Sequence, residues 1–257
     1  MVVSVEISGA LERKLRRLVE LGVYASVAEA VRDAVRRMLD SMDLRSLALE
    51  LYTSRDASLH YVTEFAGETF QGMIDYMVSR GVTPLIGAME AGDAEPIEGG
   101  EALVDVLTLY VIYKSRLGDV VASLSDGGLR LSAPRQAESL SHILVAERIR
   151  RGLPIPPRVE FVDVGEGEEG VGRYLLTPLE TGVIGYARRE GLPLVTDDYR
   201  VRLAARSLGV RTYSSLALIP TYIERLGSKP PRLAEIVLSA RAIPLVIPSE
   251  LYAAWGV

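Results

Sequence analysis

The second half of the chain alternates short apolar runs with helical patterns, and this rhythm constrains the fold more than any other feature. Apolar runs typical of strands fall at residues 102–107, 129–133, 159–163, 193–196 and 210–213. Helical patterns follow at 109–124, 135–151, 178–190, 199–208 and 216–226. Such alternation is typical of a parallel sheet with helices on both faces. We therefore predict an α/β fold, an αβα sandwich, for this region.

The composition narrows the chemistry available to the chain. Its 257 residues allow one large domain or two small ones, and 48% apolar residues suffice for a packed core. The lack of cysteine excludes disulfides, thiolate catalysis and zinc–sulfur sites. The two histidines, His60 and His142, are far apart in sequence. A metal would therefore be held mainly by oxygen ligands, which favours Mg²⁺ or Mn²⁺.

Charge and hydropathy indicate a soluble, cytoplasmic protein. No apolar stretch is long enough to span a bilayer, and the N-terminus lacks a basic-then-apolar secretory pattern, so no membrane association is expected. The net charge of −5 does not suggest nucleic-acid binding, although a nuclease can be acidic because its phosphate contacts are local. The absence of asparagine is a thermophile trait. The excess of arginine over lysine is equally compatible with a GC-rich genome.

Carboxylates stand where the predicted strands end. Asp105 lies within the apolar run 102–113, where a buried charge is costly unless it is paired or metal-bound. Asp197 and Asp198 follow the fourth strand and open a helix, and Glu180 precedes Asp198 by eighteen residues. Ligand sites of open α/β sheets form at the carboxyl ends of the strands. We therefore predict a metal site built from Asp105, Glu180 and Asp198, with Asp197 as a further candidate ligand.

Ordinary structural roles compete with this interpretation. For Asp105 the alternative is an acid at a strand end that is hydrogen-bonded to the next helix. Glu180 completes the helix-capping pattern Thr177-Pro-Leu-Glu180, and the helix dipole favours acids such as Asp197 at a helix start. Glu138, one turn into the helix after the second strand, is another candidate ligand, although most glutamates at such positions are solvated.

Arginines flank the predicted acids in the sequence. Arg135, Arg200 and Arg202 are candidate nucleic-acid contacts, because guanidinium groups bind phosphates. The alternative is that these side chains form a solvated helix face.

The first 43 residues form a separate pattern. Residues 2–7 alternate as a short strand, residues 9–21 place apolar side chains on one helical face, and Ser26-Val-Ala-Glu29 is a capping box opening a second helix. A strand and two helices of this size cannot bury a core alone. We therefore expect the segment to dimerise.

This segment resembles a ribbon-helix-helix module, the dimeric DNA-binding fold of many antitoxins. Over residues 2–40, Ala25-Ser-Val-Ala-Glu-Ala-Val-Arg32 parallels that family's Ser-x-Ser-Glu-Ala-Ile-Arg stretch. The resemblance implies a homodimer whose paired strands enter the major groove of operator DNA, with Ser4 facing the DNA. Residues 1–43 carry seven basic and seven acidic side chains, a balance that favours dimerisation over operator binding.

Residues 44–98 join the two patterned regions. Helical patterns cover most of 44–90, and the acidic, Pro/Gly-punctuated stretch 92–100 is typical of a linker. We therefore divide the chain into a dimerisation module (1–43), a helical connector with an acidic linker (44–98), and an α/β domain with a C-terminal extension (99–257).

The region from about 101 to 225 resembles PIN-domain nucleases. The resemblance rests on Leu103-Val-Asp105, Pro134 followed by Glu138, Thr177-Pro-Leu-Glu180, and Leu194-Val-Thr-Asp-Asp198. In that family an αβα sandwich carries acids that bind Mg²⁺ or Mn²⁺ and hydrolyse RNA, which implies catalytic roles for Asp105, Glu180 and Asp198. The family usually has Ser or Thr two residues after its first Asp, whereas this chain has Leu107, followed by Thr108.

A ribbon-helix-helix module joined to a PIN domain looks like an antitoxin fused to its toxin. The combination implies a metal-dependent endoribonuclease of the toxin–antitoxin type. Two alternatives remain: a DNA-binding regulator with an inactive PIN domain, and a structural or RNA-binding protein that uses the fold without catalysis. Antitoxins of the resembled systems cover their toxins, so segment 44–90 is either a restraint on the nuclease, with Arg45, Arg55 and Arg80 available, or a spacer.

Overall fold

The structure is a computed structural model that describes residues 4–156, 159–165, 167 and 172–257. These residues divide into two compact units, residues 1–47 and 48–257. Each unit is considered by itself below.

The N-terminal unit consists of two helices, α1 (Gly9–Glu20) and α2 (Val27–Asp40). The predicted start of the second helix is confirmed. The Ser26 hydroxyl accepts from the Glu29 N–H at 3.1 Å, and the Glu29 carboxylate accepts from the Ala25 N–H at 2.7 Å. The predicted strand over residues 2–7 lies partly outside the described residues, and residues 4–8 form no strand. A strand needs a neighbour to pair with, and a single copy of this unit offers none.

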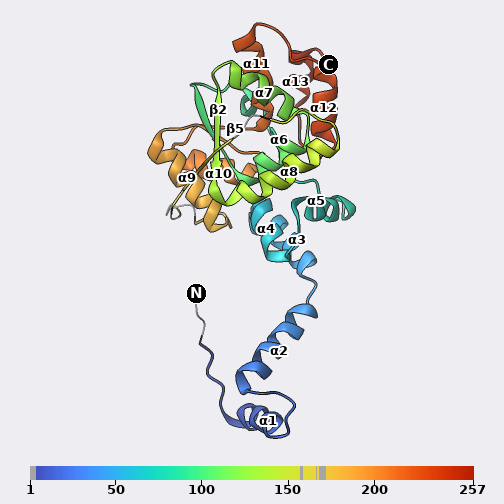
Figure 1. The fold of residues 1–257 in the computed structure, drawn as a ribbon, viewed down its shortest axis with the longest axis vertical. Helices are drawn as coiled ribbons and strands as arrows, with labels where there is room; N and C mark the ends of the chain where they lie inside the picture. Colours follow the sequence, from blue (N-terminus) through green and yellow to red (C-terminus); the bar gives the residue numbers. More distant parts are fainter. Residues whose placement is uncertain (1–3, 157–158, 166, 168–171) are drawn as a thin grey trace. The chain divides into compact units, whose positions relative to one another are not determined.

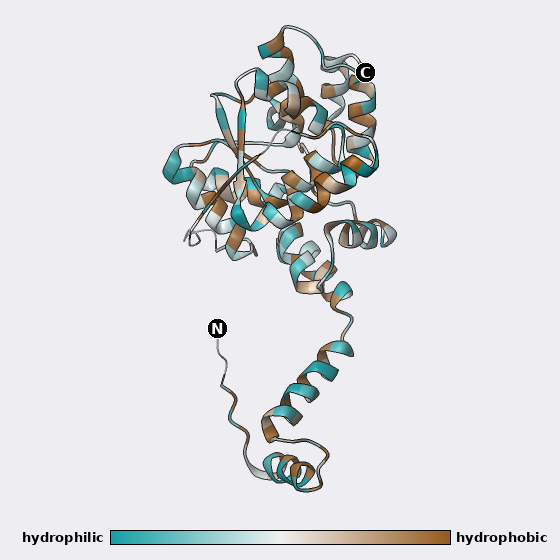
Figure 2. Cartoon of the chain, viewed as in Figure 1, coloured by the Kyte–Doolittle hydropathy of each residue, from teal (hydrophilic) through white to brown (hydrophobic). Residues whose placement is uncertain are grey.

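The N-terminal unit has almost no core of its own. In the described part of α1 and α2, Ala30 is the one buried residue. Figure 2 shows brown, hydrophobic residues alternating with teal, hydrophilic ones along both helices. The exposed large apolar side chains before residue 44 are Val5, Leu11, Leu21, Val23, Val35, Met38, Leu39 and Met42. So much exposed apolar surface on so small a unit marks an interaction face.

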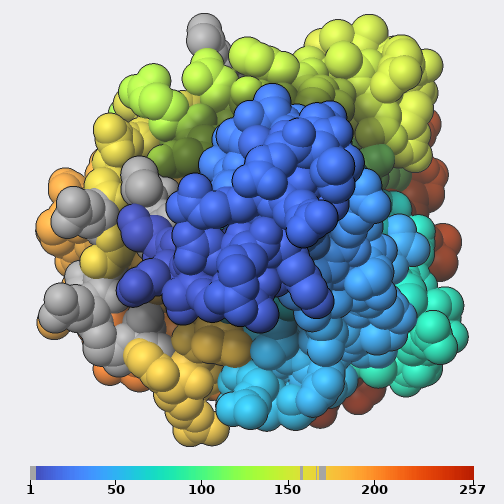
Figure 3. Space-filling model, turned by 90° about the horizontal axis from the view of Figure 1, so that it is seen from below, coloured from blue at the N-terminus to red at the C-terminus, as the bar shows by residue number. Residues whose placement is uncertain are grey.

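Helices α3 (Leu44–Ser54), α4 (Leu59–Ala66) and α5 (Phe70–Ser79) confirm the helical patterns after residue 44. They are more than a connector between two folded parts. Tyr52, Leu59 and Met73 are buried in the same hydrophobic cluster as the sheet. Figure 3 shows the light blue and teal outer surface of these helices. The expected boundary near residue 98 therefore has no counterpart in the packing, and residues 48–98 are part of the second unit.

The second unit contains a parallel sheet, as predicted (Figure 1). Its strands are β1 (Glu101–Val104), β2 (Arg130–Pro134), β3 (Glu160–Val162), β4 (Leu194–Val195) and β5 (Thr212–Tyr213). The spatial order is β3-β2-β1-β4-β5. The chain lays β2 and β3 on one side of β1 and then places β4 and β5 on the other. The point where this order reverses lies between the carboxyl ends of β1 and β4.

Successive strand residues point to opposite faces of the sheet, and their side chains pack into two hydrophobic clusters, one on each face. Leu103 and Leu194 pack with residues of α9 (Pro178–Glu190) and α10 (Tyr199–Ser207). Val104 and Val195 pack with residues of α6 (Val106–Lys114), α7 (Leu117–Asp126), α8 (Glu138–Arg150) and α11 (Leu218–Leu226). This arrangement follows from the two-residue repeat of a strand. It agrees with the predicted helix–sheet–helix layering.

Two predicted boundaries differ from the structure. The strand expected over 102–107 ends at Val104, because Asp105 caps a helix that begins at Val106. The single helix expected over 109–124 is two helices, α6 and α7, separated at Ser115 and Arg116. The C-terminal extension adds α12 (Leu233–Arg241) and α13 (Ser249–Trp255).

Candidate functional site

The predicted acids lie at the point where the strand order reverses. Asp105 directly follows β1, and Asp198 follows β4 by three residues. Because β1 and β4 are paired neighbours, their carboxyl ends deliver these acids to one edge of the sheet. Glu180 reaches the same region from the first turn of α9.

Asp105 is buried at the start of α6, with 2% of the residue exposed. Its Oδ1 accepts from the Thr108 N–H at 2.7 Å, and its Oδ2 accepts from the Thr196 hydroxyl. Burial raises the pKa of Asp105, the hydrogen bonds oppose that rise, and the Asp198 charge adds to it. Thr108 therefore contacts this acid and lowers its pKa through both its backbone and its side chain.

Asp198 caps α10 and is 1% exposed. Its Oδ1 accepts from the Arg200 N–H at 2.9 Å. Its Oδ2 accepts from the Leu59 N–H at 2.6 Å, and Leu59 is the first residue of α4. Burial raises the pKa of Asp198, and the N–H donation from Leu59 opposes the rise.

Glu180 closes the predicted capping box with Thr177, which is confirmed. Its Oε2 accepts from the Thr177 N–H at 2.7 Å and from the Ser58 hydroxyl at 2.8 Å. The residue is 3% exposed. Burial raises the pKa of Glu180 well above its usual range, and the neighbouring charges of Asp198 and Asp105 raise it further.

Asp105, Glu180 and Asp198 form one acid cluster. Consecutive residues Ser58 and Leu59 donate to Glu180 and Asp198, so those two carboxylates lie side by side. Asp105 is close enough for its charge to act on Glu180 and for the Asp198 charge to act on it. The three predicted acids therefore lie near one another at the carboxyl edge of the sheet.

Asp197 is turned toward different partners. Its Oδ1 accepts from the Ser215 N–H at 2.9 Å, and its backbone N–H donates to the Thr108 hydroxyl at 2.8 Å. Its Oδ2 is buried and has no hydrogen-bond partner among the described residues. Burial raises the pKa of Asp197 to about 6. Asp197 therefore adjoins the acid cluster without sharing its α4 donors.

Glu138 and Arg135 lie in a separate groove. With Val159, Glu160 and Phe161 they line a space of about 350 Å³ beside β3. Arg135 is exposed and Glu138 is half-buried. Of the two, Arg135 keeps a side chain that a phosphate could reach. Nothing in the described coordinates brings Glu138 into contact with the acid cluster.

Arg200 and Arg202 do not face solvent, which corrects their predicted role as phosphate contacts. Arg202 is 0% exposed and forms an ion pair with Asp93 at 2.8 Å. Arg200 is buried, donates to the Tyr52 carbonyl at 2.6 Å and stacks on the Tyr52 ring. Both guanidinium groups serve packing within the second unit. Ser4, the predicted DNA contact, is exposed in the N-terminal unit but lies in no strand.

The most important contacts of the acid cluster were not predicted from the sequence. Ser58 and Leu59 come from a segment that shows only a helical pattern, and Thr196 is an ordinary strand-end residue. The one available signal at Ser58 is its identity as a helix-capping residue before α4, which says nothing about a distant glutamate.

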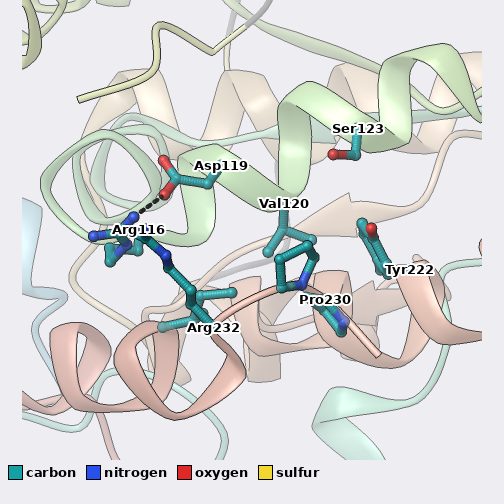
Figure 4. Close-up of a pocket in the computed structure, with 9 residues that line it drawn as sticks. Arg116, Asp119, Val120, Ser123, Tyr222, Pro230 and Arg232 are labelled. Atoms are coloured by element: carbon teal, nitrogen blue, oxygen red, sulfur yellow. Dashed lines mark ion pairs between the residues drawn. The ribbon is translucent and has the colours of Figure 1, made fainter. Parts of the chain in front are cut away.

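A cavity of about 120 Å³ lies among α7, α11 and the segment that leads into α12 (Figure 4). Its lining includes Arg116, Asp119, Ser123, Tyr222 and Arg232. Arg116 and Asp119 form an ion pair there at 3.1 Å. None of the predicted site residues lines this cavity, so it plays no part in the acid cluster.

The donor chemistry of the acid cluster fits a hard divalent cation. Burial raises the pKa of all three carboxylates, and the charge of Asp198 raises the pKa of Asp105 and Glu180 further. A positive charge would stabilise such a cluster, and carboxylate oxygens are preferred ligands of Mg²⁺ and Mn²⁺. The present arrangement is not a preformed metal site. In the described ranges, no group of three or more His, Asp or Glu side chains is arranged to hold an ion. Oxygens of Glu180 and Asp198 accept hydrogen bonds from α4 instead.

Comparison with known proteins adds no assignment: no protein family, no curated protein and no solved structure matches the chain. Over the described residues, no helix combines the length and the apolar character needed to cross a membrane.

Proposed function

We propose that this chain is a metal-dependent endoribonuclease of the toxin–antitoxin type. The observation that carries the proposal is the convergence of Asp105, Glu180 and Asp198 in one buried cluster at the carboxyl ends of β1 and β4. The family resemblance of these residues adds the substrate class, RNA. Mg²⁺ or Mn²⁺ is the proposed cofactor, held by these three acids, with Asp197 as the nearest further carboxylate.

Each acid of the cluster is held in place by hydrogen bonds from its own donors. The Thr108 N–H and the Thr196 hydroxyl orient Asp105, the Arg200 N–H orients Asp198, and Thr177 orients Glu180. A divalent ion, when bound, would supply an acidified water and neutralise charge that develops on a phosphate. Burial of the acids excludes bulk water and strengthens their attraction for a cation.

The N-terminal unit is the proposed dimerisation module. Its support is the exposed apolar surface of α1 and α2 together with a groove lined by Val5, Ile7, Val27 and Val31. A second copy of the unit would cover this surface and provide the missing partner for an N-terminal strand. Operator DNA is a further possible ligand of such a dimer, through the resemblance alone.

A second candidate function is binding without catalysis. The observation that favours it is the near-complete burial of the acid cluster, because no substrate reaches carboxylates that are 1–3% exposed and bonded to α4. In this reading the acids hold α4 against the sheet. The chain would then act as a DNA-binding regulator or an RNA-binding protein.

RNA cleavage by the full chain, with and without Mn²⁺, separates the two candidates. We expect cleavage that requires Mn²⁺ and falls at least about 100-fold in Asp105→Asn, since losing even an outer-shell partner of a metal costs 10–100-fold. Asp126→Asn is the matched control, because Asp126 is an exposed aspartate at the end of α7. Metal-independent cleavage, or an equal loss in both variants, would sink the nuclease proposal.

A further inference from the structure

We propose that the first turn of α4 is an internal stand-in for the metal, so that α4 and a divalent cation compete for the same carboxylates. The chain would therefore rest in a closed state and load a cation only when this turn is displaced. This inference rests on the proposed function and adds the regulation of its site.

Two adjacent donors at the start of α4 occupy the acid cluster. The Ser58 hydroxyl donates to Glu180 Oε2 at 2.8 Å, and the Leu59 N–H donates to Asp198 Oδ2 at 2.6 Å. Ser58 and Leu59 are both 0% exposed. These contacts span more than 120 residues of sequence, so they are tertiary contacts and not local helix capping.

The start of a helix supplies the kind of charge that a cation would supply. Its free N–H groups carry a partial positive charge, which stabilises nearby carboxylates. Within the second unit, no arginine or lysine of residues 48–90 forms an ion pair with the three acids over the described coordinates. Of the expected basic side chains, Arg55 and Arg80 are therefore not what covers the cluster. A helix start is a weaker partner than a divalent ion, which makes the cover displaceable.

Helix α4 is bounded by two backbone positions with positive φ. Asp56, just before it, has φ 51°, and Gly67, at the end of α4, has φ 66°. Between them, the Ser58 N–H donates to the Leu175 carbonyl at 2.9 Å. Leu59 and Val62 both lie in the hydrophobic core. Opening of the first turn therefore moves Leu59 out of the core, while Val62 keeps the rest of the helix packed.

Ser58 can be tested separately from helix capping. Its hydroxyl accepts from the Tyr61 N–H at 3.0 Å and also donates to Glu180. Thr69 caps α5 in the same way, accepting from the Gly72 N–H at 3.1 Å, but contacts no acid of the cluster. Ser58→Gly and Thr69→Gly thus remove equivalent caps, at a cost of a few tenths of a kcal/mol relative to Ser or Thr. Only Ser58→Gly also removes the bond to Glu180.

The experiment measures Mn²⁺ binding to the full chain by the electron paramagnetic resonance signal of free Mn²⁺, and amide hydrogen exchange at Leu59. We expect binding that Asp198→Asn abolishes, and exchange at Leu59 at least about tenfold faster with Mn²⁺ than without. We also expect Ser58→Gly to bind Mn²⁺ about tenfold more tightly than the wild type, because a competing hydrogen bond to a charged group is lost. Thr69→Gly should bind like the wild type.

The failure of the inference and the failure of the proposed function are distinguishable. Asp198-dependent Mn²⁺ binding with unchanged exchange at Leu59, or with wild-type affinity in Ser58→Gly, overturns the competition and leaves the metal site standing. Equal tightening in Thr69→Gly also overturns it, because general loosening would then explain the effect. No Mn²⁺ binding by either the wild type or Ser58→Gly overturns both the inference and the proposed function.

Discussion

Protonation of His60 should destabilise the fold in mildly acidic solution. His60 lies in α4, is 9% exposed and packs against the Phe70 ring at 5.3 Å. Burial lowers the pKa of His60 from 6.5 to about 4. The Glu64 carboxylate lies 3.2 Å from its Nε2, but the Glu64 side chain is 58% exposed, so water screens that attraction. The folded protein therefore keeps His60 neutral where the unfolded chain protonates it.

The sign and size of the effect follow from this difference in pKa. Below pH 6.5 the His60 imidazole is protonated in the unfolded state but stays neutral in the folded state. The free energy of unfolding therefore falls as the pH drops toward 4. Between about pH 7.5 and about pH 5.0 the loss attributable to His60 is about 2 kcal/mol, and it approaches about 3 kcal/mol below pH 4. Stability from this group is fully present above pH 6.5.

Urea unfolding followed by circular dichroism at both pH values measures the effect. The wild type and His60→Leu are compared, because leucine keeps an apolar side chain beside Phe70 and cannot titrate. His142→Leu is the control, since His142 is the other histidine and is exposed. The loss of stability on acidification should be about 2 kcal/mol smaller in His60→Leu than in the wild type. The same pH dependence in all three proteins would refute the reasoning.

Three further perturbations test other parts of the structure. Removing residues 1–43 should convert a dimer into a monomer in light scattering, and an unchanged dimer would place the interface in the second unit. Arg202→Met should lower the free energy of unfolding by about 1–3 kcal/mol in urea titrations, because Asp93 would lose a fully buried partner but keep its ion pair with Arg206 at 2.6 Å. A loss below about 0.5 kcal/mol would contradict this. Gly87→Ala should lower the free energy of unfolding by about 2–4 kcal/mol in the same assay. The reason is that φ is 96° at Gly87 and that an added Cβ would lie 2.6 Å from the Val246 carbonyl oxygen. Wild-type stability of the variant would contradict this by showing that the segment relaxes.

The periodic parts of this protein could be predicted from the sequence because their signals are local. The strand–helix alternation after residue 101 predicts the parallel sheet, and Ser26 and Thr177 mark helix starts because capping involves residues three apart. The positions of Asp105 and Asp198 after apolar strands predict their common edge, since parallel strands end on the same side of a sheet. The boundary at Asp105 was placed three residues late, because an apolar helix and an apolar strand look alike.

The contacts of the three acids and the burial of the arginines depend on packing between segments that are distant in the sequence. Arg200 and Arg202 have the pattern of a solvated helix face, yet their partners come from Tyr52 and Asp93, more than 100 residues away. Ser58 meets Glu180 across 122 residues. The periodicity of a helix predicts which of its faces is apolar. It does not predict which distant residue a side chain on that helix contacts, because that depends on how the helices pack on the sheet. Local sequence patterns therefore predict the sheet and the positions of its acids, whereas the packing of the start of α4 covers two of those acids.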